Sequence, residues 1–221
     1  MNPNAYPTIA GALLLAVSAV AAAGPSSNVA WDSATRALVA SGDPAAGKQK
    51  AAACAGCHGN DGIGTSPTFP NLAGQLAPYL YKQLRDYKDG KRNDSAIMTG
   101  TVAGLSDQDM ADLAAWFASL PLPPPEGKST DSKVARELAD GVGGTREFPP
   151  CGACHGARGE GKIVHVPALA GQKAAYLEAT LKNYKSGKRS NDVYARMRAI
   201  AQGLSDEQIK SLAAYYAAKT R

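Results

Sequence analysis

Aromatic side chains, long apolar runs and alternating patterns are all scarce in this sequence of 221 residues. No stretch alternates apolar and polar residues as a β-strand does, so we expect an all-α protein. Aromatic residues make up only 6% of the chain, so small domains would lack bulky core side chains unless each core holds a large apolar group. Hydrophobic residues at 44% and charged residues at 19% still indicate a globular chain.

The longest apolar run is at the N-terminus and is too short to cross a bilayer. Residues 9–23 give 15 apolar or small residues, where a spanning helix needs about 20. The run ends in Ala21-Ala22-Ala23, which offers a cleavage site, although no Lys or Arg precedes it. We expect residues 1–23 to be a cleaved signal peptide and the mature protein to be periplasmic. The alternative is an uncleaved membrane anchor facing the periplasm.

The chain contains two copies of one domain. CAGCHG at 54–59 recurs as CGACHG at 151–156, an offset of 97, and the blocks at 70–75 and 87–92 recur at the same offset. The block at 104–107 recurs at an offset of 99. Between the copies, residues 121–125 read PLPPP, which favours an extended polyproline spacer. The predicted organisation is an N-terminal domain at 24–120, a Pro-rich linker at 121–133 and a C-terminal domain at 134–221.

Each copy is predicted to be helical. Asp43 can cap a helix that begins at Pro44 and runs toward the first cysteine pair. A second helix is expected from about Pro78, and a third after the N-cap Ser106, whose counterpart is Ser205. Long loops are expected to separate these helices.

Both cysteine pairs run directly into a histidine, which is the attachment signature of c-type haem. Two thiols one helical turn apart can form thioethers with the two vinyl groups of a porphyrin, and the adjacent histidine can ligate the iron. Two disulfides, one zinc site made from both pairs, or a thioredoxin-type dithiol are the alternatives, but none of them needs the histidine to recur. The predicted attachment residues are Cys54, Cys57, Cys151 and Cys154, and the predicted iron ligands beside them are His58 and His155.

Elimination among the four methionines predicts the second iron ligand of each haem. Met110 lies on the apolar face of a helix where the other copy has Ile209, so we interpret it as a core residue. Met98 and Met197 remain, 40 and 42 residues after the histidine of their own copy, each in an expected loop. His165 is expected to be a loop histidine. If it were a ligand, Met197 would be redundant.

With these residues, the chain resembles class I c-type cytochromes, and specifically the di-haem cytochrome c-four family, over residues 41–221. The resemblance rests on the two C-x-x-C-H sites, the paired P-x-L-A-G-Q segments, the two methionines and the L-S-D caps. It implies two tandem class I cytochrome c domains related by pseudo-twofold symmetry, with two covalently bound haem c groups facing each other across the interface.

The resemblance also implies specific contacts within each domain. The carbonyls of Pro70 and Pro167 should accept a hydrogen bond from the ring N–H of the haem histidine. Gly47 should pack against Trp116 or Phe117. In the second copy the offset of 97 leads from Gly47 to position 144, in a Gly-rich stretch, so the first helix there is expected to be shorter.

Closed axial positions on both irons predict outer-sphere transfer of one electron per haem. No nucleophile or general base is arranged for catalysis, so we expect an electron transfer protein rather than an enzyme. The resemblance implies delivery of electrons to a respiratory terminal oxidase. An alternative is a di-haem electron-accepting subunit of an enzyme complex, such as flavocytochrome c sulfide dehydrogenase. A di-haem peroxidase is the weakest alternative, because the symmetric methionines leave neither iron open.

Basic residues are concentrated in the second half: the net charge is −1 over residues 24–125 and +6 over residues 126–221. Arg196 and Arg198 flank Met197, and positive charge near iron favours its reduced form, so the second haem should have the higher potential. The basic half should steer the protein to an acidic docking face on a redox partner, such as a membrane oxidase or reductase complex. The alternative is that the lysines of 182–189 are only a solvated helix face. We expect a monomer, with no nucleic-acid partner and no small-molecule substrate.

Overall fold

A computed structural model describes residues 26–127, 132–141, 148–162 and 164–221. The predicted signal peptide at 1–23 and the glycine at position 144 lie outside these described residues. In the described part of the chain, no helix is both long enough and apolar enough to cross a membrane.

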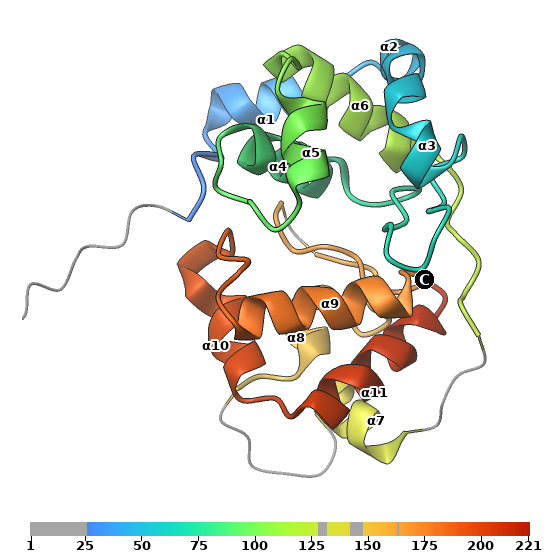
Figure 1. Cartoon of the computed structure of the whole chain (residues 1–221), viewed down its shortest axis with the longest axis vertical. Helices are drawn as coiled ribbons and strands as arrows, with labels where there is room; N and C mark the ends of the chain where they lie inside the picture. The colour runs from blue at the N-terminus through green and yellow to red at the C-terminus, as the bar shows by residue number, and fades with distance from the viewer. Residues whose placement is uncertain (1–25, 128–131, 142–147, 163) are drawn as a thin grey trace, which may run out of the picture.

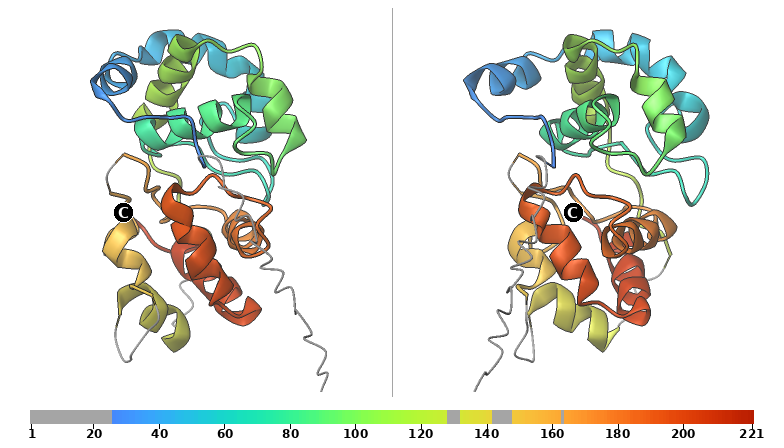
Figure 2. Two further views of the ribbon diagram at one scale, coloured as in Figure 1. Left: turned by 90° about the vertical axis from the view of Figure 1, so that its left-hand side faces the viewer. Right: turned by 60° about the vertical axis from the view of Figure 1, so that its left-hand side comes forward.

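The described chain folds as two helical domains, one above the other (Figure 1). Both views of Figure 2 show the same division. The only strand-like pairing among the described residues is one isolated bridge, which confirms the all-α prediction. The first domain contains α1 (Ser33–Ala40), α2 (Pro44–Lys50), η1 (Ala51–Ala53), α3 (Ala55–His58), α4 (Ala77–Lys88), α5 (Ala96–Val102) and α6 (Asp107–Ser119). The second contains α7 (Lys133–Asp140), α8 (Cys151–His155), α9 (Ala174–Lys185), η2 (Val193–Ala195), α10 (Arg196–Gln202) and α11 (Asp206–Ala217).

Capping residues begin the helices where the sequence predicted them. The carboxylate of Asp43 accepts a hydrogen bond from a backbone N–H in the first turn of α2. Ser106 and Ser205 begin α6 and α11 with capping boxes, in which the serine side chain and the third helical residue satisfy each other's backbone N–H groups. The predicted second helix is α4 in the first domain and α9 in the second.

Each domain has its own apolar core, built around its last helix. Met110 and Leu113 of α6 are buried in the first core, and Ile209 and Leu212 of α11 are buried in the second. Met110 and Ile209 are both 0% exposed, which confirms the interpretation of Met110 as a core residue.

The crossing of α2 and α6 depends on a glycine. A Cβ on Gly47 would lie 2.1 Å from the backbone oxygen of Asp112 and 2.8 Å from the Cβ of Trp116, so no larger residue fits. Of the two aromatic partners expected for Gly47, Trp116 makes the contact. In the second domain the buried residues Ala135 and Ala139 of α7 join the core that contains α11. There α7 has eight residues, whereas the seven residues of α2 continue directly into η1, and the expectation of a shorter first helix in the second copy stays a prediction.

Two features differ from the sequence-based expectation. Met98 and Met197 lie in the short helices α5 and α10, not in loops. Ser95 caps α5 by accepting a hydrogen bond from the backbone N–H of Met98, which explains the helix. In addition, α1 was not predicted, and it packs against α6 through Val39 and neighbouring apolar residues.

Reciprocal contacts between the domains show the pseudo-twofold relationship. Arg92 of the first domain donates to the hydroxyl of Tyr176 at 3.3 Å, and Arg189 of the second donates to the hydroxyl of Tyr79 at 3.1 Å. The two arginines and the two tyrosines are counterparts at the offset of 97. A half-turn therefore exchanges one contact for the other, as predicted for tandem domains.

After α6, residues 121–127 run along one side of the molecule from the first domain toward the second (Figure 1). Residues 121–126 have no regular structure, and the backbone N–H of Glu126 donates to the carbonyl of Ala217 at 2.8 Å. The domain boundaries drawn from the sequence stay a prediction.

Candidate functional site

One helical turn carries each cysteine pair. In the first domain the backbone N–H groups of Cys57 and His58 donate to the carbonyl of Cys54, at 3.3 and 3.0 Å. Residues three apart in a helix share a face, so the two thiols point the same way. Gly59 and Gly156 follow the two turns with φ of 73° and 87°, a left-handed conformation that favours glycine and ends the helix directly after the histidine.

Each motif histidine is buried and held by a proline carbonyl. The ring Nδ1–H of His58 donates to the oxygen of Pro70 at 2.9 Å, and that of His155 donates to the oxygen of Pro167 at 2.8 Å. These are the contacts that the family resemblance implied. Because Nδ1 carries the proton, Nε2 keeps a lone pair that a metal can use.

The surroundings keep both imidazoles neutral. Burial lowers the pKa of His58 and of His155, and the hydrogen bond to the proline carbonyl opposes this only in part. A neutral ring is the form that ligates iron. Burial also raises the pKa of the Cys54 thiol, with the neighbouring Cys57 adding to the effect.

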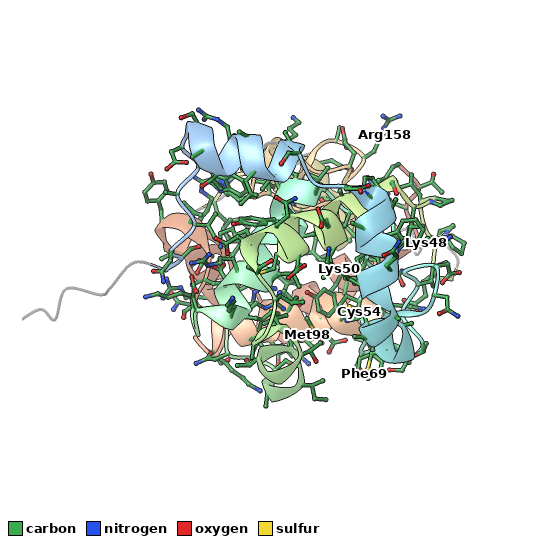
Figure 3. All side chains as sticks on the ribbon, turned by 90° about the horizontal axis from the view of Figure 1, so that it is seen from above. Lys48, Lys50, Cys54, Phe69, Met98 and Arg158 are labelled. Carbon is green, nitrogen blue, oxygen red and sulfur yellow. The ribbon has the colours of Figure 1, made fainter. Side chains whose placement is uncertain are left out.

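A cavity in the first domain collects the residues predicted for one haem. We call it the first cavity. Met98 enters it from α5 and Cys54 from the segment after α2, and Figure 3 shows these two labelled residues on separate elements. Most of its lining is apolar and includes Leu80, Val102 and Phe117. Its predicted haem residues are Cys54, Cys57, His58, Pro70 and Met98.

A matching cavity in the second domain, the second cavity, collects the counterparts. Met197 of α10 lines it, and so does His165 from the loop after α8. His165 is partly buried, and burial lowers its pKa with help from the positive charges of Lys82 and Arg196. His165 lies in a loop, as expected, and the choice of Met197 as the iron ligand stays a prediction. The predicted haem residues here are Cys151, Cys154, His155, Pro167 and Met197.

The geometry fits a covalently attached haem c group in each domain better than the alternatives. None of the four cysteines forms a disulfide. Nowhere in the described ranges do three or more His, Cys, Asp or Glu side chains gather as a metal-ion site. Each cavity instead combines two thiols on one turn, a motif imidazole with a free Nε2, one thioether and an apolar lining, which is the donor set of a haem c.

Two buried arginines belong to this site and were not predicted. Arg92 is 5% exposed and Arg189 is 2% exposed, and Arg189 lines both cavities. Arg92 lies over the ring of Tyr87 and Arg189 over the ring of Tyr184, with centroid distances of 4.5 and 4.7 Å. Gln83 accepts a hydrogen bond from each arginine, at 3.1 and 2.9 Å. The repeated Y-K-x-G-K-R block was the signal for them.

Charges around the second cavity differ from the expectation. Arg198 is paired with Asp192 at 2.8 Å, so its charge is compensated. Arg196 is exposed and lines the cavity. Lys82 reaches the same cavity from the first domain, although it is only 3% exposed.

Comparisons with known proteins point in the same direction. The family model for Cytochrome c matches residues 44–121 and 144–217. Cytochrome c4 of Pseudomonas aeruginosa is 43% identical over 180 residues, which cover 80% of this chain and 88% of the relative. The thiosulfate dehydrogenase electron acceptor of Stutzerimonas stutzeri is 40% identical over 177 residues, covering 76% of this chain and 79% of the relative. The crystal structure of reduced recombinant cytochrome c4 from Pseudomonas stutzeri matches with a TM-score of 0.76 and 36% identity, covering 81% of this chain and 100% of that one.

Proposed function

The chain belongs to the cytochrome c family and is a di-haem electron carrier, and we propose that it is a periplasmic shuttle that delivers electrons to a respiratory terminal oxidase. Each bound haem c supplies one-electron redox chemistry. The single observation that carries the proposal is that each cavity gathers two cysteines, the histidine of its own C-x-x-C-H motif and one methionine.

The protein residues determine what this site can do. His58 and His155 would each offer Nε2 to the iron, while the proline carbonyls hold the ring orientation. Met98 and Met197 line the same cavities and would supply the second protein ligand of each iron, so a small molecule would have to displace a thioether to reach it. Methionine is a neutral ligand that raises the reduction potential relative to a second histidine. The arrangement therefore supports outer-sphere transfer rather than peroxide chemistry.

An optical experiment tests this assignment. A pyridine haemochrome assay should count two haems per chain with thioether links. The oxidised protein should show the weak far-red band of methionine–iron bonding, and the pure protein should not turn over peroxide. A colourless protein, or steady peroxide turnover, would refute the proposal.

A second candidate is an electron acceptor for a dehydrogenase. The relative named as a thiosulfate dehydrogenase electron acceptor supports this function, and it corresponds to the expected alternative of an electron-accepting subunit. Two reactions separate the candidates. The reduced protein is mixed with oxidase-containing membranes and oxygen consumption is followed, and the oxidised protein is mixed with thiosulfate and a thiosulfate dehydrogenase. A fast first reaction supports the shuttle, and reduction only in the second supports the acceptor.

Export and docking belong to the same proposal. Sequencing the mature N-terminus of protein from a periplasmic extract should show cleavage after residue 23. The excess positive charge of residues 126–221 supports docking to an acidic face of a redox partner, so transfer rates should fall as ionic strength rises.

A further inference from the structure

Two glutamines cross the domain interface in opposite directions. The side-chain oxygen of Gln172 accepts from the backbone N–H of Asn71 at 2.8 Å, and its amide donates to the Asn71 carbonyl at 2.9 Å. Gln75 makes the same pair of bonds with the backbone of Ala168, both at 2.9 Å. Gln75 and Gln172 are 4% and 6% exposed, so all four bonds lie away from water.

Each glutamine contacts the peptide group that holds the haem histidine of the other domain. The N–H of Asn71 and the carbonyl of Pro70 belong to one peptide bond. Its N–H donates to Gln172, while its carbonyl accepts from Nδ1 of His58 at 2.9 Å. One peptide group thus links the glutamine of the second domain to the imidazole of the first.

The same relay runs in the other direction. The peptide bond between Pro167 and Ala168 donates its N–H to Gln75 and accepts from Nδ1 of His155 at 2.8 Å. The two relays are related by the offset of 97, so the duplicated chain makes the connection twice.

Hydrogen bonds in such a chain polarise one another, by about 10–30% per bond. Donation of the peptide N–H to glutamine places more negative charge on the peptide carbonyl. A stronger carbonyl acceptor draws the Nδ1 proton of the histidine and makes the imidazole a better electron donor to iron, which favours the oxidised state. We propose that Gln172 and Gln75 are positioning residues that lower the potential of the haem in the opposite domain. This inference rests on the proposed histidine ligation.

If these glutamines only stabilised the local structure, replacing one of them would affect the glutamine's own domain and not the opposite one. The side-chain oxygen of Gln172 also accepts the backbone N–H of Lys173 at 2.9 Å, and that of Gln75 accepts the N–H of Leu76 at 3.0 Å. These bonds lie at the starts of α9 and α4, in the domain of the glutamine itself. Loss of such a cap should disturb the glutamine's own domain, whereas the relay predicts a change in the other one.

The test replaces each glutamine by leucine and uses the two variants as controls for each other. At a fixed solution potential, Gln172→Leu should raise the reduced-to-oxidised ratio of the first haem by about threefold to tenfold, below the effect of a direct outer-shell partner. The second haem should not change. Gln75→Leu should raise the reduced-to-oxidised ratio of the second haem and leave that of the first haem unchanged. Redox titration followed by NMR resolves the two haems.

A second readout observes the histidine directly. In the reduced protein, the proton NMR signal of the His58 Nδ1–H should move upfield in Gln172→Leu, because its hydrogen bond weakens. The corresponding signal of His155 should move in Gln75→Leu. If a leucine variant does not fold, Gln172→Asn, which is one methylene shorter, should give the same directions.

Asn71→Ala is the matched control for a loosened interface. It removes a bond of 2.8 Å from the Asn71 side chain to the carbonyl of Gly171, and a bond of 3.0 Å that the side-chain oxygen accepts from the backbone N–H of Gly64, but leaves the relay peptide in place. The second copy already has an alanine, Ala168, at this position. Neither haem should change its reduction potential in this variant.

The inference would be overturned if the potential changed only for the haem in the glutamine's own domain, or equally for both haems. It would also be overturned if neither the potentials nor the Nδ1–H signals changed. Haem content and the far-red band are recorded on every variant. Their absence from the unmodified protein would instead refute the proposed function, so the two failures are distinguishable.

Discussion

The carboxylate of Asp112 in α6 accepts a hydrogen bond from the backbone N–H of Asp43 at 3.0 Å. Its other oxygen accepts from Nζ of Lys50 at 2.8 Å. Asp43 precedes α2 and Lys50 ends it. One carboxylate therefore ties both ends of α2 to α6 and fixes the approach of the chain to the first cysteine pair.

This carboxylate should make the first domain sensitive to acid. Burial raises the pKa of Asp112, but hydrogen bonds from Lys50, Asp43 and Gln108 outweigh it, so the pKa lies below its ordinary value of 3.8. The unfolded state then binds the proton more readily, and the stability from this group is present above about pH 4 and is lost as the pH falls further. The urea midpoint should fall over this range, and less steeply in Asp112→Asn.

Tryptophan fluorescence reports this domain selectively, because Trp31 and Trp116, the two tryptophans of the chain, both lie in it. Asp206→Asn in the second domain is the control. In this variant the urea midpoint followed by fluorescence should change with pH as steeply as in the unmodified protein. Equal slopes for Asp112→Asn and the unmodified protein would contradict the prediction.

Lys82 and Asp86 form a buried ion pair, and removing only one of the two charges should destabilise the folded protein. Their exposed fractions are 3% and 0%, and Asn191 of the other domain bonds to both, at 2.8 and 2.7 Å. Asp86→Asn leaves the ammonium without an anion, which should cost about 3–5 kcal/mol of unfolding free energy. The second copy has Ala179 and Asn183 at these positions. The double change Lys82→Ala with Asp86→Asn should therefore recover much of the loss in urea denaturation, and no recovery would contradict this account.

The two kinds of methionine should respond differently to leucine. Met98→Leu removes a thioether from the first cavity and should remove about half of the far-red intensity, with Met197→Leu removing the other half. Met110→Leu changes only the core, so the band should stay and stability should change by less than about 1.5 kcal/mol. If His165→Ala altered the band and Met197→Leu did not, the second haem would have a different ligand.

The second haem should have the higher potential of the two. Lys82, Arg189 and Arg196 line the second cavity with one carboxylate, that of Asp192. Arg196→Gln should lower the reduced-to-oxidised ratio of the second haem by roughly twofold to fivefold, as for an exposed charge interaction of about 0.5–1 kcal/mol. Lys210→Gln, on an exposed position of α11, is the control. A first haem that titrates at the higher potential would contradict the order.

Local signals in the sequence predicted the parts of the fold that depend on short stretches of chain. Asp43, Ser106 and Ser205 begin helices because their side chains satisfy nearby backbone N–H groups, and that chemistry is visible in four or five letters. The motif cysteines and histidines were also readable, because their spacing is dictated by the porphyrin edge.

Contacts between the domains were not readable in this way. Nothing local distinguishes Gln75 from a helix-capping glutamine, because its partner Ala168 is 93 residues away. The arginines Arg92 and Arg189 stand in a basic block, and nothing in that block shows that they are buried and contact Tyr176 and Tyr79 of the other domain. Their recurrence in both copies was the available signal. The short helices around Met98 and Met197 were missed for a different reason, since seven residues are too few for periodicity to show.

The exchange of Arg92 with Arg189 and of Tyr79 with Tyr176 has the form of an isologous dimer interface folded into one polypeptide. In a dimer of separate chains, such a face assembles only when the protein concentration is high enough. A short tether instead keeps the partners at an effective concentration of about a millimolar, whatever the dilution. The proline-rich connection thus makes the paired arrangement of the two redox centres independent of the protein concentration.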